Sequence, residues 1–262
     1  MEAKNLSFSY GEYDFFQDLN ISLEEGKITT ILGPNGSGKS TLLNLFVRQF
    51  SPSKGEIFID GSSIAQMKQK EIAKRLSVVH QHNIAPGDLT VENLVSYGRV
   101  PHQSFWKNKN EDDQEYIDWA MKSTNIYHLK DKYVNALSGG ERQRTWIAMA
   151  LAQKTNLLFL DEPTTYLDIS YQMEVLNLVK ELNRKYGITI VMVLHDINQA
   201  MQYSDKLLIM KSGKIRYSGD TENGITKEIL NEIYGIDVVI RYCPINHCKY
   251  IIPIQIRKEN SV

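Results

Sequence analysis

The sequence GPNGSGKST, from Gly33 to Thr41, places three glycines and a lysine directly before two hydroxyl side chains. The spacing Gly33-x-x-x-x-Gly38-Lys39-Ser40 is that of a P-loop, in which backbone N–H groups surround phosphates. We expect Lys39 to reach the β- and γ-phosphates and the Ser40 hydroxyl to bind Mg²⁺. The predicted nucleotide-binding residues of this loop are Gly33, Pro34, Asn35, Gly36, Ser37, Gly38, Lys39, Ser40 and Thr41.

The segments that flank the loop favour phosphate binding over an ordinary glycine-rich turn. KITTIL, before the loop, has the pattern of a buried strand, and STLLNLFVRQF, after it, has apolar residues at helical spacing. The loop is therefore expected where a strand leads into the N-terminus of a helix. There, free N–H groups and the positive end of the helix dipole favour an anion.

The composition is that of an ordinary globular protein. The chain has 262 residues, of which 42% are hydrophobic and 23% charged, enough for one large or two small cores. Its formal net charge of −1 gives no overall basic field that would favour nucleic acid. The N-terminus MEAKNLSFSY lacks the pattern of a signal peptide, and no apolar run approaches the length of a bilayer span. We expect a cytoplasmic protein.

The two cysteines, Cys243 and Cys248, are too few for a disulfide framework and fit a reducing compartment. His247 lies between them, which raises a metal site as an alternative. Zinc sites usually have four ligands at tighter spacing, and the sequence has no second Cys/His cluster. We therefore assign no metal there and interpret the segment as a C-terminal β-region.

Strand and helix patterns alternate along most of the chain, except over about residues 86–153, where helical patterns follow one another. This order predicts the α/β class, with a mainly parallel sheet and a helical subdomain inserted into it. The helical patterns of the insert are TVENLVSYGR, EDDQEYIDWAMKST and GERQRTWIAMALAQ.

In LLFLDEP, residues 157–163, an apolar strand ends in Asp161 and Glu162. Ligands of open α/β sheets bind at the carboxyl ends of the strands. We expect Asp161 to hold Mg²⁺ and Glu162 to orient and deprotonate the water that attacks the γ-phosphate. A solvated acidic strand end is the alternative, and the P-loop disfavours it.

In LSGGERQ, Ser138, Gly139 and Gly140 precede another helical pattern, so this segment also predicts a helix start suited to an anion. One nucleotide does not need two separate phosphate sites from one chain. We therefore expect the second site to serve a nucleotide held by another copy of the protein, the alternative being an ordinary helix cap.

LSGGERQ resembles the signature motif of the ATP-binding cassette (ABC) ATPases, and further elements of that family follow in order over about residues 1–218. The resemblance implies that Tyr10 in LSFSY stacks on adenine and that Gln81 in VVHQH lies between two subdomains. It also implies that the segment ending at Asp168 is the D-loop and that His195 in VLHD contacts the γ-phosphate. Considered alone, each residue has an ordinary alternative. Tyr10 could be a plain strand residue, Gln81 a surface amide and His195 a capping or core histidine.

The resemblance implies ATP and Mg²⁺ as the bound molecules and a single ABC ATPase domain over residues 1–262. Its P-loop NTPase fold has a mainly parallel sheet, an antiparallel β-subdomain and a helical insert. The implied boundaries are a nucleotide-binding core at 1–85 and 154–211, a helical subdomain at 86–153 and a short C-terminal extension at 212–262. The implied catalytic residues are Lys39, Gln81, Glu162 and His195, and the implied Mg²⁺ ligands are Ser40, Gln81 and Asp161.

A finer resemblance, carried by GRVPHQSFW, DEPTTYLDISYQMEVL and VLHDINQAMQYSDKLLIMKSGKI, is to ATPase subunits of importers for iron–siderophore, haem or cobalamin-type ligands. In that group the segment after Gln81 faces a membrane permease. Here Val100 replaces the usual aromatic residue, and Phe105 and Trp106 follow it. A structural loop between two helices is the alternative for this segment.

The sequence thus predicts the ATPase subunit of an importer of an iron–siderophore or related metal chelate. The resemblance implies a head-to-tail homodimer at the cytoplasmic face of the membrane, a separate permease and an extracellular binding protein that select the ligand. The alternatives are an exporter subunit, a soluble ABC ATPase acting on nucleic acid or ribosomes, and a nucleotide-binding regulatory module without turnover.

Overall fold

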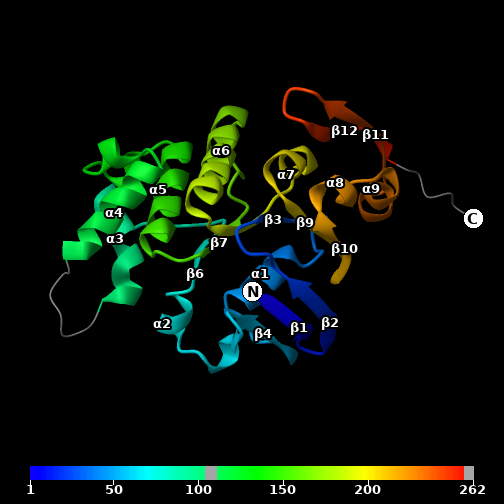
Figure 1. The fold of residues 1–262 in the computed structure, drawn as a ribbon, viewed down its shortest axis with the longest axis horizontal. Helices are drawn as coiled ribbons and strands as arrows, with labels where there is room; N and C mark the ends of the chain where they lie inside the picture. Colours follow the sequence, from blue (N-terminus) through cyan, green and yellow to red (C-terminus); the bar gives the residue numbers. More distant parts are fainter. Residues whose placement is uncertain (104–110, 257–262) are drawn as a thin grey trace, which may run out of the picture. The chain divides into compact units, whose positions relative to one another are not determined.

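The computed structural model describes residues 1–103 and 111–256, and the chain divides into two compact units (Figure 1). The terminal unit consists of Met1–Ala65 and Met192–Val262, and the central unit consists of Gln66–Val191. Both units contain strands and helices, which confirms the α/β class. Phe105 and Trp106 lie outside the described residues.

The terminal unit begins with an antiparallel sheet in the strand order β2-β1-β4-β5. Strand β1 pairs with a neighbour on each side and is nine residues long. Its inward face buries Ala3, Leu6 and Phe8, and this burial fixes the register. The strands are β1 (Glu2–Tyr10), β2 (Tyr13–Ser22), β4 (Lys54–Ile59) and β5 (Ser62–Ser63).

The strand before the P-loop, β3 (Ile28–Leu32), has all five residues buried. It pairs in parallel with β9 (Lys206–Lys211), which forms an antiparallel hairpin with β10 (Lys214–Asp220). Helix α1 (Lys39–Phe46) follows the loop and buries most of its side chains. The predicted unit of strand, P-loop and helix is therefore confirmed.

The C-terminal part of the chain folds into short helices and a two-stranded sheet. The helices are α7 (Ile197–Tyr203), α8 (Thr221–Gly224) and α9 (Lys227–Tyr234), and the strands are β11 (Ile236–Cys243) and β12 (Cys248–Ile256). The Asn198 side chain on α7 accepts a hydrogen bond from Ile251 N at 2.7 Å and donates to Ile251 O at 3.3 Å. This pair of bonds fastens the β11–β12 hairpin to α7.

The strands of the central unit follow the order β8-β7-β6, and β6 and β7 are parallel. They are β6 (Leu76–Val79), β7 (Leu157–Asp161) and β8 (Thr189–Val193), which runs across the boundary between the units. Helix α6 (Ile169–Tyr186) connects β7 to β8. The short helices η1 (Ile64–Gln66) and α2 (Gln69–Ile72) precede β6.

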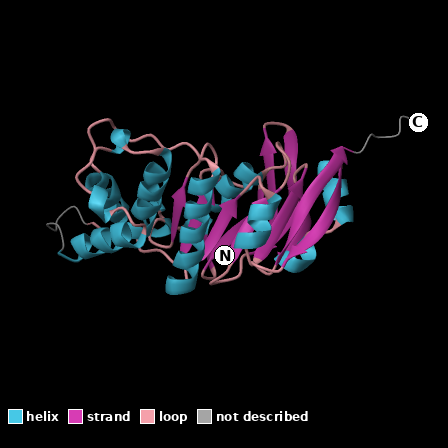
Figure 2. Cartoon of the chain, turned by 90° about the horizontal axis from the view of Figure 1, so that it is seen from above, coloured by secondary structure: helices cyan, strands magenta, loops and turns pink. Residues whose placement is uncertain are grey.

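Between β6 and β7 the described part of the central unit is built of helices, which Figure 2 shows as a cyan group at the left. They are α3 (Val91–Ser96), η2 (Tyr97–His102), α4 (Glu111–Ser123), η3 (Tyr127–Leu129), η4 (Val134–Ala136) and α5 (Gly139–Ala152). The pattern TVENLVSYGR predicts one helix, but the α-helix ends at Ser96. A 3₁₀ helix with Pro101 inside continues it, because proline cannot donate the next α-helical hydrogen bond.

Candidate active site

The P-loop has a backbone that side chains at its glycines would disrupt. A Cβ on Gly33 would lie 2.3 Å from Met210 O, and a Cβ on Gly38 would lie 2.7 Å from the Phe16 ring. Gly33, Gly36 and Gly38 all have positive φ angles. A Cβ on Gly36 would meet no atom within 4 Å, so this part of the loop is open. The loop is thus tight against the protein at both ends and accessible at its middle.

Lys39 is the first residue of α1, and its side chain is buried. Its Nζ donates hydrogen bonds to Gly33 O at 2.8 Å and to Pro34 O at 3.2 Å. The ammonium group is therefore held inside the curve of the loop, at the positive end of the helix dipole. Ser40, the next residue, is exposed. A cation and free N–H groups at one helix start form a site for phosphate.

Tyr10 lies at the end of β1, and about half of its surface is exposed (48%). Its hydroxyl shares a hydrogen bond of 2.8 Å with Thr41 Oγ1 on α1. The ring makes an edge-to-face contact with Phe8, with ring centroids 4.8 Å apart. The structure therefore fixes Tyr10 beside the P-loop helix and leaves part of its ring available for stacking.

Strand β7 carries four buried residues and then the half-buried Asp161. Glu162 follows with φ of 50°, a conformation that non-glycine residues rarely adopt. Its carboxylate accepts hydrogen bonds from Gln81 Nε2 at 2.5 Å and from Thr165 Oγ1 at 3.0 Å. Gln81 and Glu162 meet because β6 and β7 are parallel neighbours whose carboxyl ends share one edge. The motifs predict no contact between Thr165 and Glu162, although a spacing of three residues is a common one for such a bond.

The LSGGERQ segment forms the start of α5, as predicted. Ser138 is the N-cap: its Oγ accepts from Glu141 N at 3.3 Å, and its own N–H donates to Glu141 Oε2 at 2.8 Å. This second bond lowers the pKa of the Glu141 carboxyl. Ser138 and Gly139 are exposed, whereas Gly140 is buried. The helix start is therefore rigid and open to a ligand at its first two residues.

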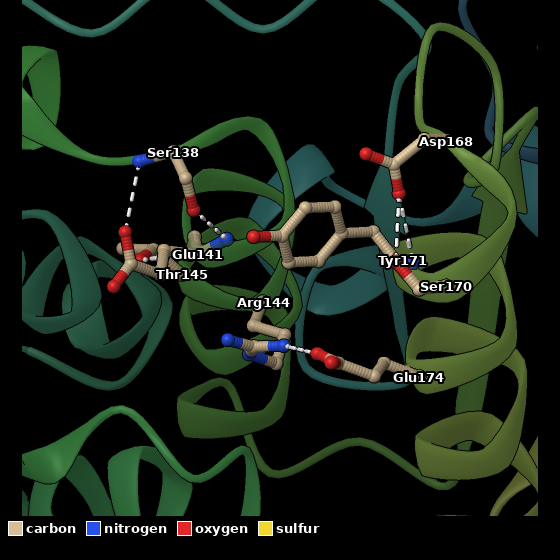
Figure 3. Close-up of polar contacts among 8 residues, drawn as sticks. All are labelled: Ser138, Glu141, Arg144, Thr145, Asp168, Ser170, Tyr171 and Glu174. Atoms are coloured by element: carbon tan, nitrogen blue, oxygen red, sulfur yellow. Dashed lines mark hydrogen bonds and ion pairs between the residues drawn. The ribbon is translucent and has the colours of Figure 1, made fainter.

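Asp168 begins the neighbouring helix in the same way. Its Oδ1 accepts hydrogen bonds from Ser170 Oγ at 2.9 Å and from Tyr171 N at 3.3 Å, which makes it the N-cap of α6 (Figure 3). Asp168 is exposed, so one of its carboxylate oxygens remains available beyond the cap.

His195 is exposed and directly follows Leu194, whose N–H donates to Ile31 O of β3 at 3.3 Å. The strand β3 leads into the P-loop, so His195 and the P-loop lie in the same unit. The terminal unit holds Tyr10, the P-loop and His195. The central unit holds the other predicted site residues, which are Gln81, Ser138, Gly139, Gly140, Asp161, Glu162 and Asp168.

The GRVPHQ segment divides into buried and exposed residues. Arg99 is buried, donates to Asp113 Oδ1 at 2.8 Å and to Ala152 O at 2.7 Å, and lies over the Tyr116 ring. By contrast, Val100 of this segment and Tyr97, which directly precedes the segment, are about half exposed, at 56% and 50%. Arg99 therefore has a structural role, whereas Tyr97, Val100 and the polar Gln103 are exposed.

The predicted Mg²⁺ ligands contain one carboxylate, that of Asp161, beside the Ser40 hydroxyl and the Gln81 amide. Mg²⁺ is commonly held by one or two carboxylates together with substrate phosphates, so this donor set suits Mg²⁺ in the presence of a nucleotide. Across residues 1–103 and 111–256, no three His, Cys, Asp or Glu side chains group as a metal site. In the same ranges, no helix is long and apolar enough to span a membrane.

Comparisons with known proteins give one consistent result. The petrobactin import ATP-binding protein FpuC of Bacillus anthracis is 48% identical over 92% of this chain and 88% of its own length. The ferric enterobactin transport ATP-binding protein FepC of Escherichia coli (strain K12) is 42% identical over 97% of this chain and 94% of its own. A solved metal-chelate type ABC transporter in an inward-facing conformation is 29% identical, covers 97% of each chain and has a TM-score of 0.83.

The family match covers much of the chain described above. The family model described as ABC transporter matches residues 16–165, a range that contains the P-loop, Gln81, the LSGGERQ segment and Glu162. The resemblance predicted from the motifs is thereby confirmed. The chain belongs to the ABC transporter family, as an ATPase of that family.

Proposed function

We propose that this ATPase energises the import of an iron–siderophore complex or a related metal chelate through a separate permease. One observation carries the proposal: the chain has two helix N-termini suited to binding phosphate, one at Lys39 and one at Ser138. The names of the relatives, an import protein for petrobactin and a transport protein for ferric enterobactin, support the class of ligand.

The proposed chemistry is the in-line attack of water on the γ-phosphate of ATP. Lys39 and the P-loop N–H groups neutralise the phosphate charge, and His195 binds the γ-phosphate. Glu162 accepts the proton of the attacking water. Ser40, Gln81 and Asp161 would hold Mg²⁺, which would supply positive charge to the phosphates. Gln81 Nε2 donates a hydrogen bond to the Glu162 carboxylate and thereby orients the base.

The Ser138 helix start is proposed to receive the nucleotide of a second copy, in a head-to-tail dimer with two shared sites. Its two exposed residues, Ser138 and Gly139, can reach a ligand from outside the chain. Asp168 would complete the same contact. Dimer formation on ATP binding and separation after hydrolysis would drive the permease at the cytoplasmic face of the membrane. An extracellular binding protein would deliver the chelate.

Replacing Tyr10 tests the position of the adenine. We expect Tyr10→Ala to weaken ATP binding by about 1–3 kcal/mol, the range measured for loss of one base–aromatic contact. Tyr10→Phe keeps the ring and removes only the hydroxyl bonded to Thr41, so it should bind ATP nearly as well. Equilibrium binding of a fluorescent ATP analogue to the monomer measures both values. Equal affinities of Tyr10→Ala and the parent would place adenine elsewhere.

The proposed function is tested by uptake of radioactive iron chelates into vesicles that contain the co-expressed permease and this chain. Transport should require ATP on the side of the vesicle membrane where the ATPase lies. A ferric siderophore should be transported in preference to a sugar or an amino acid. ATP-dependent efflux, or no iron uptake with any chelate tried, would contradict the proposal.

The η2 segment supplies a separate test of permease binding. We expect the double variant Tyr97→Ala/Val100→Ser to lose most of its affinity for the permease, because exposed apolar side chains at an interface contribute strongly to binding. Its melting temperature should stay near that of the parent. Arg99→Ala is the control for damage to the fold, since it removes a buried ion pair and should lower the melting temperature instead. If the double variant bound the permease as well as the parent does, GRVPHQ would be a structural loop and not a permease contact.

A further inference from the structure

The first turn of α6 packs directly on the start of α5. A Cβ on Gly140 would lie 2.6 Å from Tyr171 Cδ1 and 3.0 Å from Tyr171 Cγ. Figure 3 shows the Tyr171 ring reaching from the start of α6 to the start of α5, toward Ser138 and Glu141. Tyr171 is half-buried, and the atoms nearest to a Cβ on Gly140 are Cδ1, Cγ and Cβ of Tyr171. Gly140 at the start of α5 therefore lies directly against the Tyr171 side chain.

Two further contacts join the same helices. A Cβ on Gly139 would lie 3.2 Å from Leu167 Cδ2, so the residue before Asp168 also touches the Ser138 segment. One turn further along, Arg144 of α5 forms an ion pair with Glu174 of α6. The contacts thus lie on both sides of Tyr171, and the ring is the largest apolar group among them.

Tyr171 is itself held by the cap of its helix. Asp168 Oδ1 accepts a hydrogen bond from the Tyr171 backbone N–H at 3.3 Å, and this bond fixes the first turn of α6. The same aspartate is exposed at the corner where α6 begins. A displacement of Asp168 would therefore move the Tyr171 ring and, through the ring, Gly140.

We infer that Tyr171 is a positioning residue that sets where the Ser138–Gly140 segment stands relative to Asp168. This inference rests on the proposed function, in which both groups face the nucleotide of a second copy. A rigid link between them makes the two contacts form together when ATP joins the protomers. Neither the P-loop pattern nor the LSGGERQ pattern assigns a role to this position.

The test measures ATP-induced dimerisation by size-exclusion chromatography, with Glu162→Gln present in every protein to stop turnover. We expect Tyr171→Ala to raise the ATP concentration for half-maximal dimerisation about tenfold, and Tyr171→Leu to raise it less. Tyr171→Phe retains the ring and should stay within about twofold of the parent. ATP binding to the monomer should be unchanged in all of them. The matched control, Asn177→Ala, replaces an exposed residue of the same helix.

A double variant that enlarges residue 140 and shortens residue 171 distinguishes a positioning role of Tyr171 from a general loss of stability. Gly140→Ala places a methyl group in the Tyr171 ring and should abolish the dimer. Tyr171→Ala removes the contacts at 2.6 Å and 3.0 Å and leaves only the Cβ of residue 171 at 3.3 Å, so adding Gly140→Ala in that background should cost much less than in the parent. Equal costs in both backgrounds, or a Tyr171→Ala protein that dimerises like the parent, would overturn the inference alone. A parent Glu162→Gln protein without any ATP-dependent dimer would overturn the proposed function as well.

Discussion

Glu162→Gln should lower the ATPase rate about 10³-fold while ATP binding remains, since a general base contributes 10²–10⁴-fold and an amide cannot accept the proton. The substitution keeps the size of the side chain and an oxygen that can still accept hydrogen bonds from Gln81 and Thr165. The geometry at the end of β7 should therefore survive. Release of phosphate from ATP by the purified protein gives the rate, and size-exclusion chromatography with ATP should show a stable dimer.

Glu181→Gln serves as the control for this experiment, because Glu181 is an exposed carboxylate on α6. It should hydrolyse ATP at the parent rate. If Glu162→Gln also retained the parent rate, the base would have to be another group, and the assignment of Glu162 would be wrong.

Lys39→Ala and Ser138→Arg should each be nearly inactive alone, and for different reasons. The first removes the cation that lies inside the P-loop. The second places a bulky cation at the exposed cap of α5, where the proposed partner nucleotide would lie. In a mixture, the Ser138→Arg chain supplies an intact Lys39 and the Lys39→Ala chain an intact Ser138. One of the two shared sites is then whole.

Hydrolysis can require both sites together, so dimerisation is the cleaner measurement for the mixture. With Glu162→Gln in each chain, the mixed variants should form an ATP-dependent dimer that neither forms alone. For the unmodified protein, the ATPase rate per mole should rise with protein concentration until dimers saturate. A rate independent of concentration, together with no dimer in the Glu162→Gln protein, would mean that Ser138 serves its own chain or no nucleotide.

The sequence predicts the elements whose signals are local. The P-loop is fixed by glycines that must adopt positive φ next to a helix start, and the helix caps at Ser138 and Asp168 depend on residues within three positions. The C-terminal β-region that contains the two cysteines is also as predicted, since it forms β11 and β12. The exact end of α3 is not, because the helical pattern TVENLVSYGR continues past Ser96, where the α-helix ends and a 3₁₀ helix begins.

The roles within GRVPHQ show where local patterns fail. The family resemblance implies a permease interface for this segment as a whole. The fold instead buries Arg99 between α4 and α5, because Asp113 and the Ala152 carbonyl satisfy its guanidinium there. Only partners distant in the sequence could reveal this.

The family and its ATPase chemistry could be predicted from short motifs along the chain, because the chemistry requires their spacing. Which side chains support these motifs depends on tertiary packing. Gln81 meets Glu162 because two parallel strands end at one edge, and Tyr171 lies on Gly140 because two helices pack at their first turns. Such contacts depend on the close packing of residues far apart in the chain, where the spacing in sequence carries no signal.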